Sequence, residues 1–548
     1  MAELGAVVVV AAALGLVARR GAHVGTWAPL GRVIGSERRA LVGVALLAFG
    51  LAALSSAARP PLPNVHDELS NLLAADTFAH GRLTNPPHPF WEHFETFHVL
   101  SQPSRQSKYP PGQALFMAVG QVLTGRPIVG VWLVLALSCG ALYWCLRFWT
   151  PRSWAIFGAL LPVVRFGSGI YWDHILWSYW STTYWGGSVA LLGGALTLGA
   201  AARLMRRARP RDAGLLGLGL TALAVSRPFE GLILAAAVAV VLLSSLTRQG
   251  GWRLLIRALA PTAVVATVGL GTLGYYNWRV TGSALTPPYL AYVRAYDVAP
   301  FFTFQELTEE PEYRHDVLRR YHLGFMVDIF EHQKCGPGLE WSDIASLSSF
   351  LLGSALAIFL LIGVLRRDRW RDFVLITLAA SALAHAFTQS AVFRAHYLAP
   401  FVPGLLLLTI RGLRVAGTSE RRGNRFGGAV ARAAVVVSVA MFFIGAALRA
   451  SFPREGADHW AIQRRQIVEH LMTEGAEHLI FVRYAPDHNV HEEWVYNLSE
   501  IDRQPIVWAR EISPEKNRSL AEYFGDRRAW VIEPDVSPPR LTRYVPGR

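Results

Sequence analysis

Two adjacent acids, Asp67 and Glu68, lie in the segment HDELSNLLAADTFAHGRL, which follows an apolar run that ends near Ala58. A carboxylate at a membrane boundary is costly unless it is solvated, paired or active. Adjacent helical residues point about 100° apart, so one acid can face a cavity while the other takes a structural partner or a metal. A carboxylate beside an acceptor hydroxyl can remove its proton as the oxygen attacks an activated carbon. The simpler interpretation is a solvated helix N-terminus, where acids favour the dipole.

A second candidate group is Lys108 with Tyr109, which precede two prolines in the segment KYPPGQALF. Proline suits the first turn of a helix, so this segment predicts a cation and a phenol held just before a helix. The lysine could bind a lipid-linked phosphate as a point charge. Alternatively, it could extend its ammonium group to the lipid headgroups.

The segment SRPFEGL places Arg227 and Glu230 between two apolar runs that are too closely spaced for a true loop. Ionisable residues at such a depth are functional candidates, and the proline and glycine of this segment break the helix there. Arg227 could make bidentate contacts with a phosphate, with Glu230 as its partner at rest. A purely structural Arg–Glu pair is the alternative.

The segment FRAHYLAP adds two more basic groups, Arg394 and His396, at another membrane edge. We predict that all of these cations face the same side of the membrane as the two acids. Two acids that activate an acceptor and cations that hold a phosphate leaving group together fit a transfer reaction from a phosphorylated lipid.

The composition indicates a polytopic membrane protein. The 548 residues are 52% hydrophobic, and nearly uncharged runs of about 15–22 residues match the bilayer core. The formal net charge of +14 is concentrated in short arginine-rich loops, so membrane topology explains it better than nucleic-acid binding. We predict about twelve spans: 4–18, 40–58, 128–148, 153–168, 184–204, 213–226, 229–247, 257–277, 345–365, 372–390, 397–412 and 432–450.

The loops between these spans alternate in charge. By the positive-inside tendency we place the arginine-rich loops in the cytoplasm and the other loops outside. Residues 112–125 are treated as a juxtamembrane helix at the outer interface, because about 14 residues are too few to span. The loops and tail predicted outside are 59–127, 169–183, 278–344, 391–396 and 451–548.

The predicted organisation has four parts. Transmembrane helices in 1–58 lead to the outer loop 59–127 with the acidic motif, and 128–450 form the transmembrane body, which carries the outer loop 278–344. Residues 451–548 predict a small extracytoplasmic α/β domain. Its predicted elements are strands at 478–484, 505–511 and 529–535 and a helix at 517–525.

Several kinds of site are disfavoured by the sequence. The three cysteines form no CxxC pattern, and neither a P-loop nor a GxGxxG after a strand is present. The tail segment RYAPDHNVHEEW supplies His488, His491, Glu492 and Glu493, which could form a metal site but lack the spacing of zinc-binding motifs. The absence of these nucleotide-binding fingerprints from the sequence favours a lipid-linked donor over a nucleotide sugar.

Together, these motifs resemble the GT-C superfamily of integral-membrane glycosyltransferases. The nearest groups are the protein O-mannosyltransferases and the bacterial aminoarabinose–lipid A transferases. The resemblance covers roughly residues 40–450 and rests on HDE in the first outer loop, KYPPGQALF, SRPFEGL and the multi-helix body with an outer C-terminal domain. In the aminoarabinose group the order is usually Lys-Pro-Pro, whereas Tyr109 intervenes here.

The resemblance implies a polyprenyl-phosphate sugar donor and transfer at the outer face of a bacterial inner membrane, by direct displacement with inversion. Asp67 would act as general base and Glu68 would assist, with a divalent metal left open and no other cofactor expected. The acceptor could be a lipid, a glycan or a protein. The residues implied to hold the donor phosphate are Lys108, Tyr109, Arg227, Arg394 and His396.

Two other classes of protein compete with this interpretation. A transporter or flippase of a lipid-linked saccharide would show paired repeats of interrupted helices with charges near the middle of the membrane. We find no convincing internal repeat, and the acids lie in a long outer loop. In a non-catalytic membrane assembly protein, the outer tail would be the working part.

Overall fold

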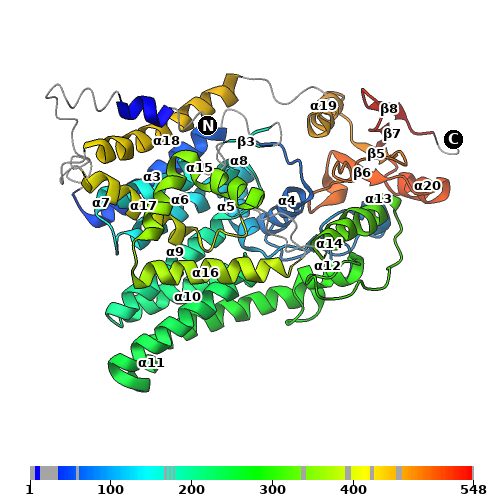
Figure 1. The fold of residues 1–548 in the computed structure, drawn as a ribbon. Helices are drawn as coiled ribbons and strands as arrows, with labels where there is room; N and C mark the ends of the chain where they lie inside the picture. Colours follow the sequence, from blue (N-terminus) through cyan, green and yellow to red (C-terminus); the bar gives the residue numbers. More distant parts are fainter. Residues whose placement is uncertain are drawn as a thin grey trace.

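The computed structural model describes residues 6–12, 35–56, 61–165, 169–171, 174–176, 179–334, 341–388, 396–419, 425–451 and 459–545. Side chains of 166–179 and 335–350 are outside this description, and so is Arg394. The helices of the central chain gather into a body on one side of the molecule, and the C-terminal strands lie on the other side (Figure 1).

Among the described residues, five helices are long and apolar enough to cross a membrane, so the chain is an integral membrane protein. They are α3 (Glu37–Ser56), α6 (Pro127–Leu146), α9 (Ser188–Arg206), α11 (Pro228–Thr281) and the Gly427–Ala447 part of α18 (Arg425–Ser451). Other helices of the same body are α5 (Gly112–Thr124), α7 (Arg152–Val164), α10 (Pro210–Ala224), α15 (Trp341–Leu365), α16 (Arg369–Ala386) and α17 (Val402–Ser419). The number of twelve spans stays a prediction.

Helix α11 is a hairpin of two arms, which correspond to two of the predicted spans. Gly251 has a φ of 65°, a left-handed conformation that glycine adopts without strain, and it breaks the helix there. The side chain of Gln249 donates to the carbonyl of Met205 at the end of α9 (2.9 Å), and Thr262 donates to the carbonyl of Ala213 early in α10 (2.8 Å). The turn of the hairpin therefore lies beside the connection between α9 and α10.

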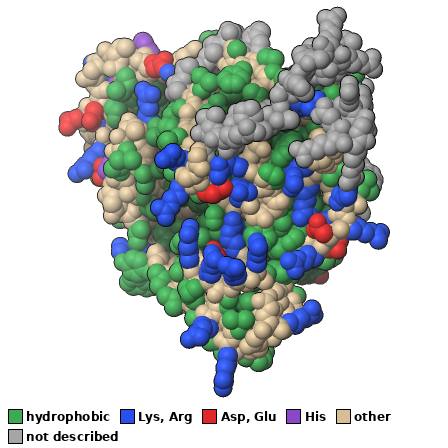
Figure 2. Space-filling model, turned by 90° about the vertical axis from the view of Figure 1, so that its left-hand side faces the viewer, with side chains coloured by type: hydrophobic (Ala, Val, Ile, Leu, Met, Phe, Trp, Pro, Cys, Tyr) green, Lys and Arg blue, Asp and Glu red, His purple; other side chains and the backbone are tan. Residues whose placement is uncertain are grey.

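The arginine-rich connections meet at one end of the body. Glu37, which begins α3, pairs with Arg147 and Arg152 at the α6–α7 connection (2.9 and 3.0 Å). Asp368, which precedes α16, pairs with Arg411 of α17 (2.6 Å). Figure 2 shows this end, where basic side chains gather over the centre and lower part of the face with few acids between them. The predicted grouping of these loops is therefore present in the fold.

The other end of the body carries residues 61–127, the first of the loops predicted to lie outside. Helix α4 (His66–Ala79) contains the two acids and packs against α5. With 13 residues, α5 is too short to cross the membrane, and its place at the outer interface stays a prediction. Between α4 and α5 lie η1 (Trp91–Phe94) and the antiparallel pair β1 (Val99–Leu100) and β2 (Gln106–Ser107).

The predicted outer loop 278–344 contains more regular structure than its sequence pattern indicated. It holds α12 (Pro288–Tyr296), α13 (Asp316–Arg319), a π-helical turn η2 (Arg320–Phe325) and α14 (Met326–Lys334). In Figure 1 these helices lie to the right of the body and below the C-terminal strands, and Tyr321 of η2 contacts His66 at the start of α4. A short hairpin, β3 (Gly169–Tyr171) and β4 (His174–Leu176), and α8 (Tyr179–Thr182) precede α9.

The C-terminal region forms a four-stranded mixed sheet in the order β6-β5-β7-β8. The central strand β5 is buried along its whole length and pairs in parallel with both neighbours, as an unbroken apolar run favours. The predicted strands and helix are present within a few residues, while β8 and α19 were not foreseen. The elements are α19 (Trp460–Met472), β5 (His478–Val482), η4 (Ile501–Arg503), β6 (Ile506–Arg510), α20 (Pro514–Tyr523), β7 (Arg528–Glu533) and β8 (Arg540–Arg543).

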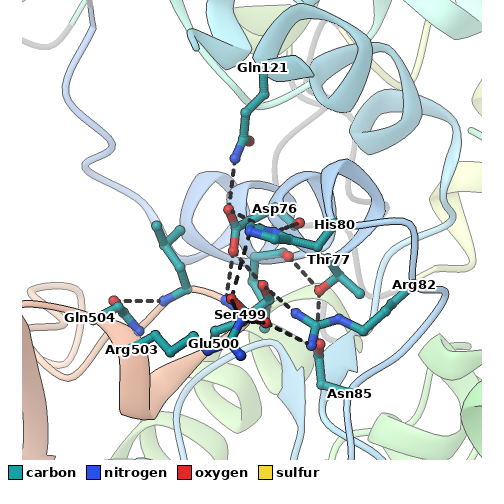
Figure 3. A network of polar contacts seen from close by, with 12 residues as sticks. Asp76, Thr77, His80, Arg82, Asn85, Gln121, Ser499, Glu500, Arg503 and Gln504 are labelled. Atoms are coloured by element: carbon teal, nitrogen blue, oxygen red, sulfur yellow. Dashed lines mark hydrogen bonds and ion pairs between the residues drawn. The ribbon is translucent and has the colours of Figure 1, made fainter.

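Helix α4 is fixed between the body and this C-terminal region by its buried Asp76 (Figure 3). The carboxylate accepts hydrogen bonds from the backbone N–H and hydroxyl of Ser499 (2.9 and 2.5 Å) and from Gln121 of α5 (2.7 Å). Arg82, just after α4, pairs with Glu500 (3.2 Å). A buried carboxylate with several donors fixes the position of its helix firmly.

Candidate functional site

Asp67 lies in the first turn of α4, where its carboxylate meets two side chains from the following loop. Its Oδ1 accepts a hydrogen bond from the hydroxyl of Tyr109. The Nδ1 atom of His98 lies 3.0 Å from the same oxygen. The Asp67 side chain remains 18% exposed, so it is not sealed off by these partners. The structure therefore brings together two residues that the sequence singled out, Asp67 and Tyr109.

The surroundings of Asp67 favour its ionised form. Burial raises the pKa of this carboxyl, but the hydrogen bond and charge of His98, together with the charges of Lys108 and His396, hold the pKa well below its usual range. Burial, followed by the charge of Lys108, lowers the pKa of His98 to about 4. At neutral pH the pair is thus a carboxylate beside a neutral imidazole.

Glu68 has different partners from Asp67 and accepts hydrogen bonds from backbone groups at both carboxylate oxygens. Its Oε2 accepts from the N–H of Asn64 (3.0 Å) and its Oε1 from the N–H of Tyr184 (2.8 Å). The side chain is buried. This acid therefore joins the start of α4 to the segment between α8 and α9, which is the structural partnership that the sequence left open for one member of the pair.

The raised pKa of Glu68 predicts that the stability of the protein depends on pH. Burial raises its pKa to about 7, against the N–H groups that lower it. Because the folded-state pKa lies above the unfolded value, folding takes up a proton between about pH 4.5 and 7, so the free energy of unfolding falls as pH rises through that window. Thermal unfolding from pH 4.5 to 7.5 should show this fall in wild type and a flatter profile in Glu68→Gln. Identical profiles in the two proteins would contradict it.

Lys108 is buried, and its ammonium group lies against aromatic rings. The Nζ atom is 4.5 Å from the ring centre of Tyr292 and 5.5 Å from those of Tyr109 and Tyr289. Burial lowers the pKa of Lys108, while the charges of Asp297 and Asp67 raise it. Within the described part of the chain, no carboxylate forms an ion pair with this ammonium. Cation–π contacts stabilise it without using its three N–H donors.

Arg227 precedes the first turn of α11, and its guanidinium lies 4.8 Å from the ring of Tyr397. Tyr397 in turn packs on His396 (4.6 Å between ring centres), and His396 on Trp185 (5.0 Å). His396 also acts electrostatically on Asp67. Two predicted residues from segments about 170 positions apart along the chain, Arg227 and His396, thus flank the same tyrosine.

The expected pairing of Arg227 with Glu230 is wrong. The Oε1 atom of Glu230 lies 3.4 Å from Nε2 of His385 on α16, and both side chains are buried. Arg227 has a φ of −138° and a ψ of 74°, outside the helical region. The i, i+3 spacing that would bring two helical side chains together therefore does not apply to it.

Tyr289 of α12 connects the two halves of the site. Its ring is 5.5 Å from the Lys108 ammonium. Burial raises the pKa of its hydroxyl, the charges of Asp297 and Asp67 raise it further, and the charge of Arg227 lowers it. The Lys108 ammonium therefore lies against this phenol, and the charges of Asp67 and Arg227 act on it. We call the residues Asp67, His98, Lys108, Tyr109 and Arg227 the Asp67 cluster.

No motif or periodic pattern pointed to His98 or to the buried residues that support it. Tyr292 accepts a hydrogen bond from the backbone N–H of His98 (3.0 Å). The hydroxyl of Tyr292 lies 3.3 Å from Nε2 of His322, whose Nδ1 lies 2.7 Å from Asp297. The abundance of tyrosine in 278–344 was visible, but no periodicity assigned it to one face.

The described residues hold no assembled donor set for a metal, and a divalent metal stays an open expectation. Within the described ranges, no group of three or more His, Cys, Asp or Glu side chains is placed to hold an ion. In the tail, His488 lies 2.5 Å from Asp535. Glu493 pairs with Arg510 (2.6 Å). These two tail residues therefore have protein partners.

No family model matches the chain, and no curated protein matches it in sequence. Similar solved structures include the Archaeoglobus fulgidus oligosaccharyltransferase in complex with Zn and sulfate, at 12% identity and a TM-score of 0.47, over 89% of this chain and 67% of that one. The oligosaccharyltransferase AglB from Archaeoglobus fulgidus, in complex with an inhibitory peptide and a dolichol-phosphate, has 11% identity and a TM-score of 0.43, over 90% of this chain and 69% of that one. ArnT from Cupriavidus metallidurans in the apo state has 15% identity and a TM-score of 0.48, over 93% and 95%.

These proteins are glycosyltransferases of the GT-C superfamily that the motifs resemble. With identities of 11–15% and TM-scores below 0.5, they do not decide what this chain acts on. The functional case therefore depends on the Asp67 cluster itself.

Proposed function

We propose that this protein is a membrane glycosyltransferase that moves a sugar from a polyprenyl-phosphate donor to an acceptor hydroxyl at the extracytoplasmic face. The observation that carries the proposal is that Tyr109 contacts both a carboxylate and a cation: its hydroxyl donates to Asp67, and the Lys108 ammonium lies 5.5 Å from its ring centre. A second cation, Arg227, lies on the ring of Tyr397, which packs on His396. An acid–base group beside paired phosphate-binding groups is the arrangement that transfer from a phosphorylated lipid requires.

In the proposed reaction, the acceptor oxygen attacks the anomeric carbon of the donor and Asp67 takes the acceptor proton. The bond from that carbon to the phosphate oxygen breaks, and the polyprenyl phosphate leaves with the electron pair. Lys108 and Arg227 stabilise the negative charge that develops on the phosphate, with Tyr109 and His396 beside them. A single displacement of this kind inverts the anomeric centre.

The cationic groups differ in what they can offer the phosphate. Arg227 presents a planar fork that can contact two phosphate oxygens, whereas the Lys108 ammonium is a compact charge held between rings. Arg394 lies outside the described residues and stays a proposed member of this group. Glu68, which binds backbone amides, supports the position of α4 in this scheme.

The charge distribution supports an extracytoplasmic site. The arginine-rich connections occupy the end of the body seen in Figure 2, while α4, which carries Asp67, lies toward the C-terminal sheet in Figure 1. Basic loops favour the cytoplasmic side. We therefore assign the cluster to the opposite face, which in a bacterial inner membrane is the periplasmic face.

The test is a transfer assay with the full chain in lipid nanodiscs. A radiolabelled polyprenyl-phosphate sugar is supplied with cell-envelope lipids and glycans as acceptors, and the released polyprenyl phosphate is measured. The proposal expects donor cleavage that depends on acceptor. Movement of the intact labelled lipid between leaflets without any cleavage would overturn the proposal and support a flippase.

A further inference from the structure

His98 has an unusual backbone conformation next to the Asp67 carboxylate. Its φ is 59°, the one positive value for a non-glycine residue in the described part of the chain. A side chain in the left-handed region costs free energy unless the surroundings hold it there, and such residues concentrate at functional sites.

The surroundings of His98 fix its backbone at both polar groups. Its N–H donates to the hydroxyl of Tyr292 (3.0 Å). Its carbonyl accepts from the hydroxyl of Ser70 (2.6 Å) and from the N–H of Lys108 (3.0 Å). Glycine or asparagine would satisfy this backbone more easily than histidine. The choice of histidine therefore has to be explained by its side chain.

The imidazole of His98 has different partners at its two nitrogens. Nδ1 lies 3.0 Å from Asp67 Oδ1 and 3.0 Å from the Tyr109 hydroxyl, while Nε2 lies 3.2 Å from the hydroxyl of Tyr321. The His98 side chain is 8% exposed and that of Asp67 18%, so the ring lies beneath the carboxylate. When the Tyr321 hydroxyl donates to Nε2, the ring proton resides on Nδ1 and faces Asp67.

We infer that His98 is a positioning residue for Asp67, and that it acts through the Nδ1–H group, which fixes the carboxylate so that its second oxygen faces the acceptor. The inference rests on the proposed function in one respect, that Asp67 is the base. His98 itself touches neither the donor nor the acceptor. The left-handed backbone sets the direction of its ring, and Tyr292, Ser70 and Lys108 maintain that backbone.

Two substitutions distinguish the role of Nδ1 from the role of Nε2 in the His98 ring. In His98→Asn the side-chain amide occupies the place of Nδ1, and asparagine tolerates a positive φ. In His98→Gln the amide occupies the place of Nε2, so Asp67 keeps the Tyr109 hydroxyl but loses the donor from position 98. We expect His98→Asn to keep kcat within about 3-fold and His98→Gln to lower it by about 10- to 100-fold with an unchanged KM for the donor, since a small misplacement of a catalytic group costs that much.

A matched pair elsewhere controls for the loss of a buried histidine. The Nε2 atom of His88 lies 2.9 Å from Asp502, in the contact with the C-terminal region and outside the Asp67 cluster. The two variants His88→Asn and His88→Gln should have the same kcat as each other when kcat is calculated for the folded protein. A kcat of His98→Gln equal to or above that of His98→Asn, with the His88 pair alike, would overturn the inference.

A second measurement does not depend on sugar transfer. A water-soluble carbodiimide labels protonated carboxyl groups, and mass spectrometry reports the rate at Asp67. Loss of the Nδ1–H donor should make Asp67 easier to protonate, so His98→Gln should be labelled several-fold faster than wild type near pH 5, and His98→Asn at nearly the wild-type rate. Equal rates in all three proteins would overturn the role of His98 even if no donor is ever turned over.

Discussion

The Asp67→Asn substitution is expected to reduce sugar transfer by about 10²- to 10⁴-fold, the usual contribution of a general base. Asparagine has the size of aspartate and can still meet His98 and Tyr109, but its amide cannot take up a proton at neutral pH. Donor binding should change little, because Lys108 and Arg227 supply the phosphate contacts in the proposed mechanism. The loss should therefore fall on kcat rather than on the KM for the donor.

The control for this prediction is the same chemical change on the same helix. Asp76, near the end of α4, accepts hydrogen bonds from Ser499 and Gln121 (Figure 3). Asp76→Asn should lower the melting temperature, because it turns a buried acceptor into a group with an unmatched donor, while the folded fraction keeps its kcat. If Asp67→Asn retained full turnover, the base would have to be another group, and the proposed mechanism would fail.

The elements of the fold were predictable where the signal is local. Apolar runs located the two arms of α11, and arginine in the short connections grouped them at one end of the body. The strands β5, β6 and β7 also follow from short apolar runs bounded by polar segments. In each case the side chains of one segment determine its structure.

The sequence identified several residues of the site, but it did not indicate which side chains they contact. Charged side chains and phenols are costly at a membrane boundary unless they are solvated, paired or functional. This argument identified Asp67, Tyr109, Lys108 and Arg227 as candidates. Their actual contacts depend on His98, which follows no periodic pattern and takes a left-handed backbone only because tertiary partners hold it.

Two expectations about pairs depended on helical spacing and illustrate its limits. Arg227 and Glu230 are three positions apart, yet Arg227 stands before the helix begins and Glu230 contacts His385 from α16 instead. Glu68, adjacent to Asp67, is directed by two backbone N–H groups, one of them more than 100 residues away. Long-range hydrogen bonds of this kind leave no trace in local sequence periodicity.

Removal of the charge of Lys108 is expected to affect donor binding and stability in opposite directions. Lys108→Met keeps an unbranched side chain of similar length but deletes the ammonium group. Hydrogen bonds to charged groups contribute about 1.5–3 kcal/mol, so the Kd for the donor should rise by about 10- to 100-fold. The measurement is equilibrium binding of a labelled polyprenyl-phosphate sugar to nanodisc-embedded protein.

The matched control is Lys516→Met. Lys516 is an exposed lysine that pairs with Glu92 in the contact between α20 and the first outer loop. It lies on the C-terminal region, so its loss should leave donor binding unchanged. An equal loss of affinity in the two variants would indicate a general electrostatic effect and contradict a phosphate contact at Lys108.

The stability of Lys108→Met distinguishes a functional from a structural lysine. A buried ammonium without a carboxylate partner among the described residues costs desolvation free energy that contacts with the rings of Tyr289 and Tyr292 offset only in part. Methionine avoids that cost, so the melting temperature without donor should stay level or rise. A structural lysine would show the reverse, with a lower melting temperature and unchanged affinity. A lysine that binds the donor phosphate is expected to keep its charge at a cost in stability. The donor then supplies the missing negative partner when it binds.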